Sequence, residues 1–441
     1  MQSSSTGCSW SGSRPASPTS GGWTPGCRCR GAPRRARACR RGRSPSPTCR
    51  PRSIPTRRPA AGASSAAPRS GCSIRRASHP ACSRPATGCA SCRSPCPSSS
   101  DWREKRVSIL VNKPGLQTTV QDAGRHGLQH IGVVPCGAMD GIALEFANAL
   151  VGNAPAEAAL EVTVLGPELL FEQEALVALC GAEFDARLNG ATLPLDRPVL
   201  VGRGDRLQVL RAVAGSRAYL AVAGGIATAP VLGSRSTYIP ARFGGLEGRA
   251  LRMGDRVPLA KDAARLAATR FARLQSKKVF DGGVRSVAWS VPALTRPERE
   301  PILVHAMEGR HHDLFDAASR RAFFEATWRV SPDSNRMGLR LAGPGLARER
   351  AGEINSEPAC LGTVQVPSGG QPIALMADHQ TTGGYPKIAE IAAADVPRLA
   401  QLAPGGSVRF ARCTLEQAGE LRRVLRRRVD SALRALNWTF R

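Results

Sequence analysis

The first hundred residues contain no Leu, Val, Phe, Tyr, Asn, Lys, Asp or Glu, and this absence most constrains where the chain can fold. They consist almost entirely of Arg, Ser, Pro, Ala, Gly, Cys and Thr, with two Ile. Such a segment cannot bury enough apolar surface to offset the conformational entropy that ordering removes. We therefore expect a disordered leader over residues 1–106 and a folded protein over residues 107–441.

The residue types of the leader are those that GC-rich codons specify. We interpret the leader as a wrong-frame extension of a high-GC gene, with the native start near Val107. An intact-mass measurement on protein from the native host tests this interpretation, because a mature chain that begins at Met1 would contradict it. The leader has no apolar segment of the kind that a secretory signal requires. Its ten cysteines are interpreted as a result of codon bias and not as metal ligands.

The formal charge of +28 is concentrated in the leader. Residues 1–106 contain 20 Arg, one Lys and two acids, a net charge of +19, which leaves 41 basic and 32 acidic residues, a net of +9, beyond them. A charge of that size is ordinary for an enzyme, so no nucleic-acid partner is expected. No apolar run reaches the roughly 20 residues of a membrane helix, so no membrane partner is expected. The four cysteines beyond the leader lack paired spacing, which is typical of a reduced, cytoplasmic protein.

From Val107 onward the chain consists of short apolar runs separated by Gly, Pro and Asn, which predicts β-strands. Asn189-Gly190 predicts a hairpin, because both residues tolerate positive φ. One clear helix is predicted near residues 140–152, with Asp140 as its N-cap. The apolar residues that share a face of this helix are Ala143, Phe146, Ala147 and Leu150.

Many short strands with one or two helices in each half predict a mainly β protein built from two tandem β-barrel domains. We place the first barrel at residues 107–260, a linker region at residues 261–300 and the second barrel at residues 301–414. Residues 415–441 predict a basic C-terminal helix that docks on its own domain with a solvated cationic face. The apolar face of this helix comprises Leu421, Val424, Leu425, Ala432, Leu433 and Leu436.

Familiar nucleotide-binding and hydrolase motifs are missing from the chain. It has no G-x-x-x-x-G-K-[ST] loop, no G-x-G-x-x-G between a strand and a helix, no G-x-S-x-G elbow and no H-E-x-x-H pair. Its one histidine cluster, His311-His312-Asp313, is interpreted as a polar turn, and no metal site is predicted. No Met-Lys-Met segment of the kind that carries biotin occurs, so we expect no biotin attached to this chain.

Two polar, glycine-rich segments are candidates for binding a carboxylate or a phosphate, because an arginine beside hydroxyls and glycine amides suits such anions. The candidate residues are Gln121, Asp122 and Arg125 in residues 117–127, and Arg235, Ser236, Thr237 and Tyr238 ahead of Gly244-Gly245. Glycine pairs are also usual at barrel corners, and for these two segments both interpretations stay open.

The third candidate is "ADHQTTGGYPKI", residues 377–388. Asp378 and His379 could transfer protons if burial tunes their pKa values, and Lys387 could supply a positive charge. Gly383-Gly384 could form an anion-binding nest of backbone amides. A plain turn rarely collects so many reactive groups, so this segment favours a functional site. The residues predicted to bind the substrate here are Gln380, Thr381, Thr382, Gly383, Gly384 and Tyr385.

Four motifs, "QTTVQDAGRHG", "GSRSTY", "SNRMGLRL" and "QTTGGYPKI", together resemble the allophanate hydrolase subunit 2 family. This family is also called the urea amidolyase-related or biotin-dependent carboxyltransferase family, and it includes the C subunit of the bacterial ATP-dependent 5-oxoprolinase. The resemblance runs in order from about Val107 to Arg412 and does not include the leader. It implies a pair of cyclophilin-like β-barrel domains.

The resemblance also implies an activity, namely opening of 5-oxoproline to L-glutamate with ATP and Mg²⁺. The lactam carbonyl oxygen is phosphorylated so that water can attack it, and the chain works with a subunit-A-like and a subunit-B-like protein. In this implied site Arg235, Arg336 and Lys387 would bind phosphate and the substrate carboxylate, while Asp378 or His379 would transfer protons. One departure is "EPAC", residues 357–360, where relatives carry a small, glycine-containing segment, and it affects the loop near Glu353 and Ser356.

Two alternative functions stay open. One is carboxyl transfer from carboxybiotin to urea or a related amide, although the chain has no carrier segment and no biotin carboxylase part. The other is a non-enzymatic regulatory subunit that binds a partner protein. A neighbouring gene for a subunit-B-like protein would support the 5-oxoprolinase function, and a neighbouring biotin carboxylase gene would support carboxyl transfer.

Overall fold

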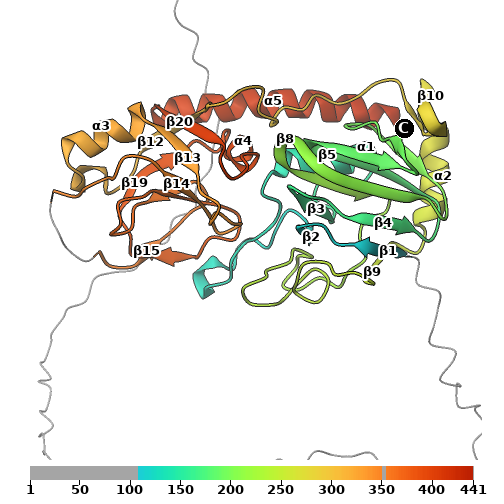
Figure 1. Cartoon of the computed structure of the whole chain (residues 1–441), viewed down its shortest axis with the longest axis horizontal. Helices are drawn as coiled ribbons and strands as arrows, with labels where there is room; N and C mark the ends of the chain where they lie inside the picture. Colours follow the sequence, from blue (N-terminus) through green and yellow to red (C-terminus); the bar gives the residue numbers. More distant parts are fainter. Residues whose placement is uncertain (1–107, 350–353, 441) are drawn as a thin grey trace, which may run out of the picture. The chain divides into compact units, whose positions relative to one another are not determined.

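The computed structural model describes residues 108–349 and 354–440 (Figure 1). The leader predicted for residues 1–106 lies outside the described residues. Within them the protein is mainly β, as predicted, with five α-helices. No helix in the described ranges is both long and apolar enough to cross a membrane.

The first β unit is an antiparallel sheet of eleven strands. Its two long strands, β5 and β8, pair along most of their lengths and form its centre. The strands of the sheet are β1 (Ser108–Lys113), β2 (Gln117–Gln121), β3 (Ala159–Thr163), β4 (Glu168–Phe171), β5 (Ala175–Leu188), β6 (Ala191–Thr192), β7 (Val199–Val201), β8 (Arg206–Val222), β9 (Arg256–Pro258), β10 (Lys277–Val279) and β11 (Arg285–Val287).

Local sequence signals in this unit are confirmed. Helix α1 (Gly141–Leu150) begins at Asp140, whose carboxylate accepts a hydrogen bond from the backbone N–H of Ala143 at 3.0 Å. All four residues predicted to share its apolar face are buried. Asn189 and Gly190 join β5 to β6 with φ values of 52° and 89°, as the hairpin signal predicts.

Residues 261–300, predicted as a linker region, contain regular structure. They form helix α2 (Ala263–Arg273) and the β10–β11 hairpin, and β11 pairs with β7 in the first sheet. The apolar pattern is weak here because α2 buries only Ala263 and Ala267, and all three residues of β10 are exposed.

The second β unit contains a closed barrel with the strand order β12-β19-β16-β17-β14-β13-β20, so the prediction of a barrel is confirmed for this half. The parallel pairing of β12 with β20 closes the barrel. Its strands are β12 (Ile302–Glu308), β13 (Thr327–Val330), β14 (Gly338–Ala342), β16 (Thr363–Gln365), β17 (Ile373–Leu375), β19 (Lys387–Ile391) and β20 (Ser407–Arg412). Beside it lie helices α3 (Ala317–Glu325) and α4 (Val396–Ala400) and the small sheet of β15 (Glu357–Pro358) and β18 (Thr382–Gly383).

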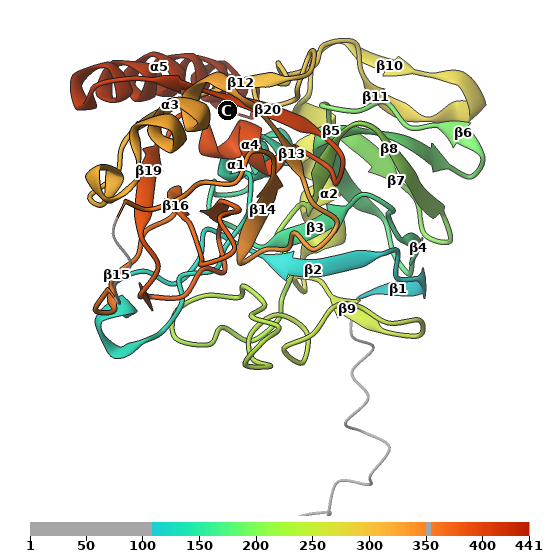
Figure 2. The same ribbon diagram turned by 60° about the vertical axis from the view of Figure 1, so that its left-hand side comes forward.

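Helix α5 (Leu415–Thr439) packs on both β units (Figures 1 and 2). Near its start, Ala418 and Leu421 pack with Met307 and Ala392 of the barrel unit. Further along, residues of α5 join the apolar core around α1; they are Leu425, Val429, Ala432, Leu433 and Leu436. The predicted face is therefore largely confirmed, except that Val424 is 43% exposed and Val429 is buried in its place.

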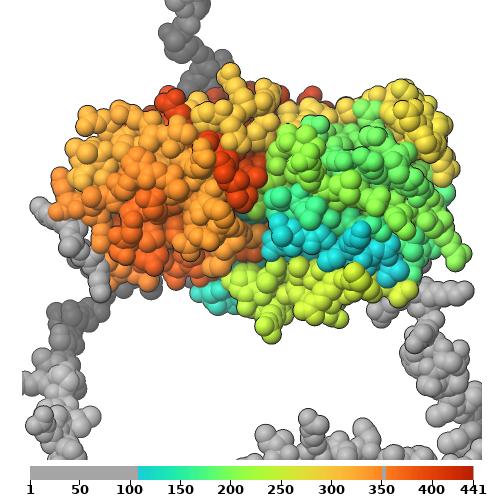
Figure 3. Space-filling model, viewed as in Figure 1, coloured from blue at the N-terminus to red at the C-terminus, as the bar shows by residue number. Residues whose placement is uncertain are grey.

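The two β units also meet through buried polar contacts beside α4. The side-chain oxygen of Gln401 accepts hydrogen bonds from the backbone N–H groups of Ser216 and Arg217, at 3.2 and 3.1 Å. In return, a guanidinium N–H of Arg217 donates to the carbonyl of Ala400 at 2.5 Å. Figure 3 shows residues near α4, in red-orange, between the orange surface of the barrel and the green surface of the sheet.

Candidate functional site

The first two predicted segments lie together, and Asp122 joins them. Its carboxylate accepts hydrogen bonds from the hydroxyls of Ser234 and Ser236, both at 2.6 Å, and from the backbone N–H groups of Gly124 and Arg235. Both carboxylate oxygens are thus used to hold the loop after β2 against residues 234–236. The Asp122 side chain stabilises this arrangement of loops.

The Gly244-Gly245 pair packs against the same loop. Both glycines have positive φ, and a Cβ atom at either position would overlap Ser236 or Thr237. Only glycine permits this close approach of two backbones. The close packing of these two loops therefore explains why glycines occupy positions 244 and 245.

The other predicted residues of these segments differ in exposure. Arg125 is buried, donates to the carbonyl of Ser236 at 2.5 Å and lies over the ring of Phe243. Arg235 has a partly exposed side chain that donates to the carbonyl of Thr228 at 2.9 Å and lies 3.5 Å from Glu157. Gln121 and Thr237 are buried together, with a hydrogen bond from the Gln121 amide to the Thr237 carbonyl at 3.2 Å. The hydroxyl-bearing ring of Tyr238 packs edge-on against Phe243.

Asp378 pairs with Arg336 in the interior. Nε and Nη2 of Arg336 lie 3.0 and 2.9 Å from the two carboxylate oxygens of Asp378, which is 2% exposed. Nη1 of the same guanidinium pairs with Glu161 on β3, and Nη2 also donates to the carbonyl of Gly137 at 2.6 Å. We name Glu161, Arg336 and Asp378 the Arg336 cluster. A phosphate could reach this guanidinium only by displacing these acceptors.

The electrostatics of the Arg336 cluster favour the charged forms of Glu161 and Arg336. Burial alone would raise the pKa of Glu161, but the guanidinium groups of Arg336 and Arg217 lower it below its ordinary value. Burial alone would lower the pKa of Arg336, but the carboxylates of Asp378 and Glu161 raise it. Burial and the nearby Asp378 raise the pKa of the Cys136 thiol to about 12. That thiol is therefore protonated at neutral pH and is a poor nucleophile.

Lys387, at the start of β19, is held in a second group of side chains. Its Nζ donates to the carbonyl of Pro358 at 2.7 Å and lies 3.2 Å from a carboxylate oxygen of Glu357. The ring of His311 lies 3.8 Å from that carboxylate, and its Nδ1 accepts the backbone N–H of Lys387 at 3.3 Å. We name His311, Glu357 and Lys387 the Lys387 cluster.

The Lys387 cluster combines a cation, a carboxylate and a neutral imidazole. Burial lowers the pKa of His311, and because Nδ1 accepts a hydrogen bond, the ring proton is on Nε2, toward Glu357. The hydrogen bond from Lys387 lowers the pKa of Glu357, so this carboxylate is ionised at neutral pH. Burial raises the pKa of the nearby Glu390, whose carboxylate accepts the Thr363 hydroxyl at 2.8 Å. These groups can bind a polar substrate and exchange a proton with it.

Between the two clusters, the loop presents buried amides and an imidazole. Nδ1 of His379 lies 2.7 Å from the carbonyl of Gln380, and burial lowers the pKa of His379. A neutral ring that donates from Nδ1 keeps a lone pair on Nε2, as a general base requires. The Gln380 amide donates to the side-chain oxygen of Gln365 at 3.2 Å, and Nε2 of Gln365 is buried without a hydrogen-bond partner among the described residues.

The remaining predicted residues of this loop lie in or beside strand β18. The amide nest predicted at Gly383-Gly384 is wrong, because Thr382–Gly383 forms strand β18 and neither glycine has the positive φ that a nest uses. The carbonyl of Thr381 accepts the backbone N–H of Ala359 at 2.9 Å, and Tyr385 is 50% exposed. A Cβ atom at position 383 would lie 2.7 Å from Nε2 of Gln365, so a larger residue there would shift the end of that side chain.

The loop of residues 378–387 therefore contributes to two separate networks. Asp378 belongs to the Arg336 cluster and Lys387 belongs to the Lys387 cluster, and no hydrogen bond or ion pair of the described residues joins the two. The catalytic roles of Asp378, His379 and Lys387 stay predictions.

Four residues of these networks were not predicted from the sequence as site residues. They are Glu161, His311, Glu357 and Gln365. Two of them lie within features that the sequence makes visible, since His311 is part of the histidine pair and Glu357 begins the departure "EPAC". Neither feature indicates on its own that these side chains meet Lys387.

Acidification is expected to destabilise the protein through His379. Burial lowers the pKa of His379 below its ordinary value, so the unfolded chain binds a proton at a pH where the folded chain does not. The free energy of unfolding therefore falls as the pH drops below the ordinary pKa of histidine. His379→Asn removes this contribution, so its melting temperature should fall less than that of the wild type between about pH 7.5 and pH 5.5. The exposed His130 offers a control, and equal pH dependence in His379→Asn and His130→Asn would contradict the prediction.

Comparisons with known proteins agree on one family. The family model described as "Carboxyltransferase domain, subdomain A and B" matches residues 131–412, which include both clusters. The chain is 41% identical over 310 residues to the C subunit of 5-oxoprolinase from Escherichia coli (strain K12), covering 70% of this chain and 93% of that protein. It is 36% identical over 313 residues to the C subunit of 5-oxoprolinase from Haemophilus influenzae, covering 70% of this chain and 92% of that protein.

A solved structure shows a similar fold. The crystal structure of the K. lactis urea amidolyase is similar with a TM-score of 0.65 and 31% sequence identity. The match covers 74% of this chain and 20% of that one, so the chain spans about a fifth of the length of that larger protein.

Proposed function

Because the chain belongs to the carboxyltransferase-domain family, subdomains A and B, and is a homologue of the C subunit of 5-oxoprolinase, we propose that it fills this place in an ATP-dependent 5-oxoprolinase. In this proposal it helps to open 5-oxoproline to L-glutamate together with a subunit-A-like and a subunit-B-like protein. The observation that best supports a part in the chemistry is the Lys387 cluster, where a buried ammonium, a carboxylate and a neutral imidazole converge.

The lactam carbonyl is the group that must be polarised. Amide resonance makes it a weak electrophile, so hydrogen-bond donors aimed at its oxygen would stabilise the charge that develops there. In the proposal, Nζ of Lys387 and the unpaired Nε2 of Gln365 are these donors. A buried N–H without an acceptor is costly, and a substrate oxygen would remove that cost.

Proton transfer would fall to a histidine of the site. Burial lowers the pKa values of His311 and His379, so both rings are neutral at neutral pH. Nδ1 of His311 already accepts the backbone N–H of Lys387, whereas Nε2 of His379 keeps a lone pair that can accept a proton from an attacking water. Asp378 is already bound through both oxygens to Arg336. We therefore propose that His379 rather than Asp378 is the proton acceptor and that Asp378 positions the start of the loop.

ATP with Mg²⁺ would supply the phosphoryl group, and the Lys387 cluster fits this group poorly. The carboxylate of Glu357 would repel a polyphosphate, and no three His, Cys, Asp or Glu side chains in residues 108–349 and 354–440 are arranged to hold a metal ion. We propose that a partner protein holds most of the nucleotide and that this chain holds the lactam.

The proposal also includes the domain type and the cellular location of the chain. We take the two β units to be the pair of cyclophilin-like domains that the family resemblance implies, with the barrel unit supported by its closed strand order. The four cysteines of the described residues are free thiols, which suits a reducing, cytoplasmic location.

The test of this function uses the full chain purified with the subunit-A-like and subunit-B-like partners. We expect release of ADP and L-glutamate in equal amounts, only when all three proteins and 5-oxoproline are present. A rate of ATP hydrolysis that is the same with and without 5-oxoproline, or no turnover by a well-folded complex, would contradict the proposal.

Carboxyl transfer is the second candidate, because the matching family model and the K. lactis urea amidolyase both point to it. The same preparation can be given carboxybiotin and urea. Urea-dependent loss of the carboxyl group from carboxybiotin, without turnover of 5-oxoproline, would favour this second function.

A further inference from the structure

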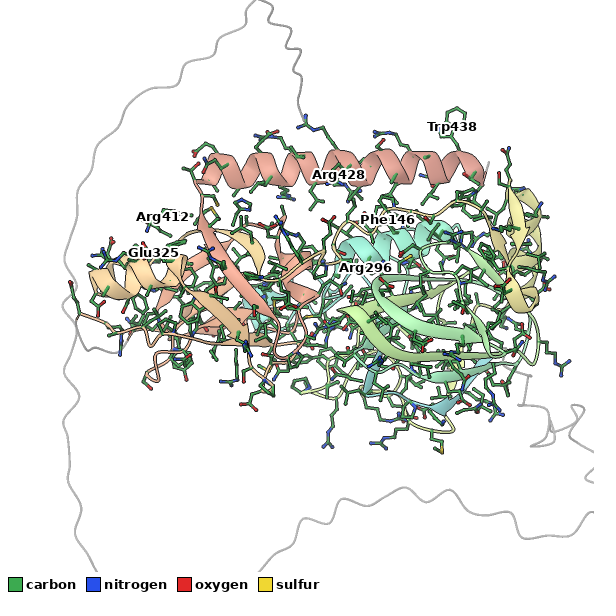
Figure 4. All side chains as sticks on the ribbon, turned by 45° about the horizontal axis from the view of Figure 1, so that its top comes forward. Phe146, Arg296, Glu325, Arg412, Arg428 and Trp438 are labelled. Atoms are coloured by element: carbon green, nitrogen blue, oxygen red, sulfur yellow. The ribbon has the colours of Figure 1, made fainter. Side chains whose placement is uncertain are left out.

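A cavity of about 480 Å³ lies in the barrel unit beside α3, apart from the Lys387 and Arg336 clusters. It is lined by the ends of β12 and β20, by the short 3-10 helix at residues 312–314 and by α3, and Figure 4 labels two lining residues, Glu325 and Arg412. Two neighbouring histidines lie in different surroundings: His311 belongs to the Lys387 cluster, and His312 lines this cavity. Neither cluster shares a residue with the cavity lining.

His312 is the first sign that the cavity takes a ligand. It is 6% exposed, and neither ring nitrogen has a hydrogen-bond partner among the residues that the structure describes. Its Nδ1 lies 3.6 Å from Asp313 and 3.8 Å from Glu308, which is too far for a hydrogen bond. Buried polar nitrogens are almost always bonded, and a ligand atom in the cavity would supply the missing partner.

The charges around the cavity indicate which kind of ligand it would bind. The lining contains three arginines and three carboxylates, and two of these pairs are already formed, Arg412 with Glu308 and Arg320 with Asp313. Arg321 and Glu325 remain, and no ion pair of the described part of the chain includes either of them. An anion alone would meet three carboxylates, and a cation alone would meet three arginines. A molecule that carries both charges suits both sets.

An apolar wall completes the cavity. The ring of Phe324 lines it, with the guanidinium of Arg412 over the ring face at 4.6 Å from the centroid. The stem of a small ligand can pack on this wall while its charged ends reach the polar side chains. Ligand sites commonly combine a few placed polar groups with such a surface.

We propose that this cavity binds a free amino acid as a zwitterion. Its carboxylate accepts hydrogen bonds from Arg321 and from the ring of His312, and its ammonium group donates to Glu325. This proposal concerns a site apart from the Lys387 cluster and does not depend on the 5-oxoprolinase function.

The test is isothermal titration calorimetry on the full chain with L-glutamate, L-alanine and L-arginine as probes. We expect at least one to bind, and its analogues that lack either the ammonium or the carboxylate group to bind about tenfold more weakly or worse, because each loses a charged hydrogen bond. Arg321→Ala should weaken binding by a similar factor. Arg329→Ala removes another exposed arginine, on β13 outside the cavity, and should change nothing.

Two further variants separate this site from the candidate catalytic site. His312→Gln should weaken binding, while Lys387→Ala should leave the amino-acid affinity unchanged. Binding that Lys387→Ala abolishes and Arg321→Ala preserves would move the amino acid to the Lys387 cluster and overturn the proposal. Equal affinity for the amino acids and for their analogues that lack the ammonium or the carboxylate group, or no binding by any of the three amino acids, would overturn it as well. Because Arg321 is exposed, its replacement leaves the barrel core intact.

Discussion

Replacing Arg336 with alanine is expected to lower the free energy of unfolding by about 3–5 kcal/mol. The substitution leaves the carboxylates of Glu161 and Asp378 in the interior without their shared cation, and it removes the hydrogen bond to the carbonyl of Gly137. Arg336 comes from the barrel unit and Glu161 from the first sheet, so the loss also weakens the contact between the two β units. The cost is mostly that of burying two carboxylates that have lost their shared cation.

Urea unfolding followed by fluorescence and circular dichroism measures this change. Arg340→Ala is the matched control, because Arg340 is exposed on β14 and its replacement should cost less than about 0.5 kcal/mol. Arg336→Lys should fall between the two, since an ammonium restores the charge but cannot bind a carboxylate through two parallel bonds. An Arg336→Ala protein as stable as Arg340→Ala would show that the cluster contributes little to folding.

Replacing Lys387 with methionine is expected to lower 5-oxoproline-dependent turnover by about a hundredfold or more, the usual effect of removing one donor to a developing negative charge. Methionine keeps an apolar stem of similar length, so the strand should keep its place in the barrel. The carboxylate of Glu357 keeps partial access to solvent, which limits the cost of losing its partner. The effect should therefore appear in catalysis and not in folding.

Turnover by the assembled complex, the melting temperature and recovery of the partners in a pull-down separate these effects. Lys113→Met is the matched control, because Lys113 pairs with Glu168 at the surface and its side chain is 70% exposed. It should retain full turnover. If Lys387→Met also keeps its activity, the Lys387 cluster is a structural feature of the barrel and the site must lie elsewhere.

Much of the fold could be predicted because its signals are local. The Asn189-Gly190 turn, the Asp140 cap and the apolar face of α1 each depend on residues within a few positions of one another. The sheet strands at residues 277–287 could not be predicted in this way. They are three residues long, and β10 gains its place only by pairing with β11, which in turn reaches β7.

The candidate site could be predicted only in part for the same reason. The reactive groups of residues 378–387 are visible in the sequence, but their partners are distant in the chain. Glu161 precedes Arg336 by 175 positions, and Glu357 precedes Lys387 by 30. The histidine pair carries no local signal that His311 lies near Glu357 while its neighbour lines a different cavity.

Helix α5 has a consequence for biosynthesis. It follows both β units in the chain, so it can pack across them only after the ribosome has made both. Until then, the apolar groups that it covers around α1 and Met307 stay in contact with water. We therefore expect the nascent chain to be most prone to aggregation just before α5 emerges, because these apolar groups are then uncovered.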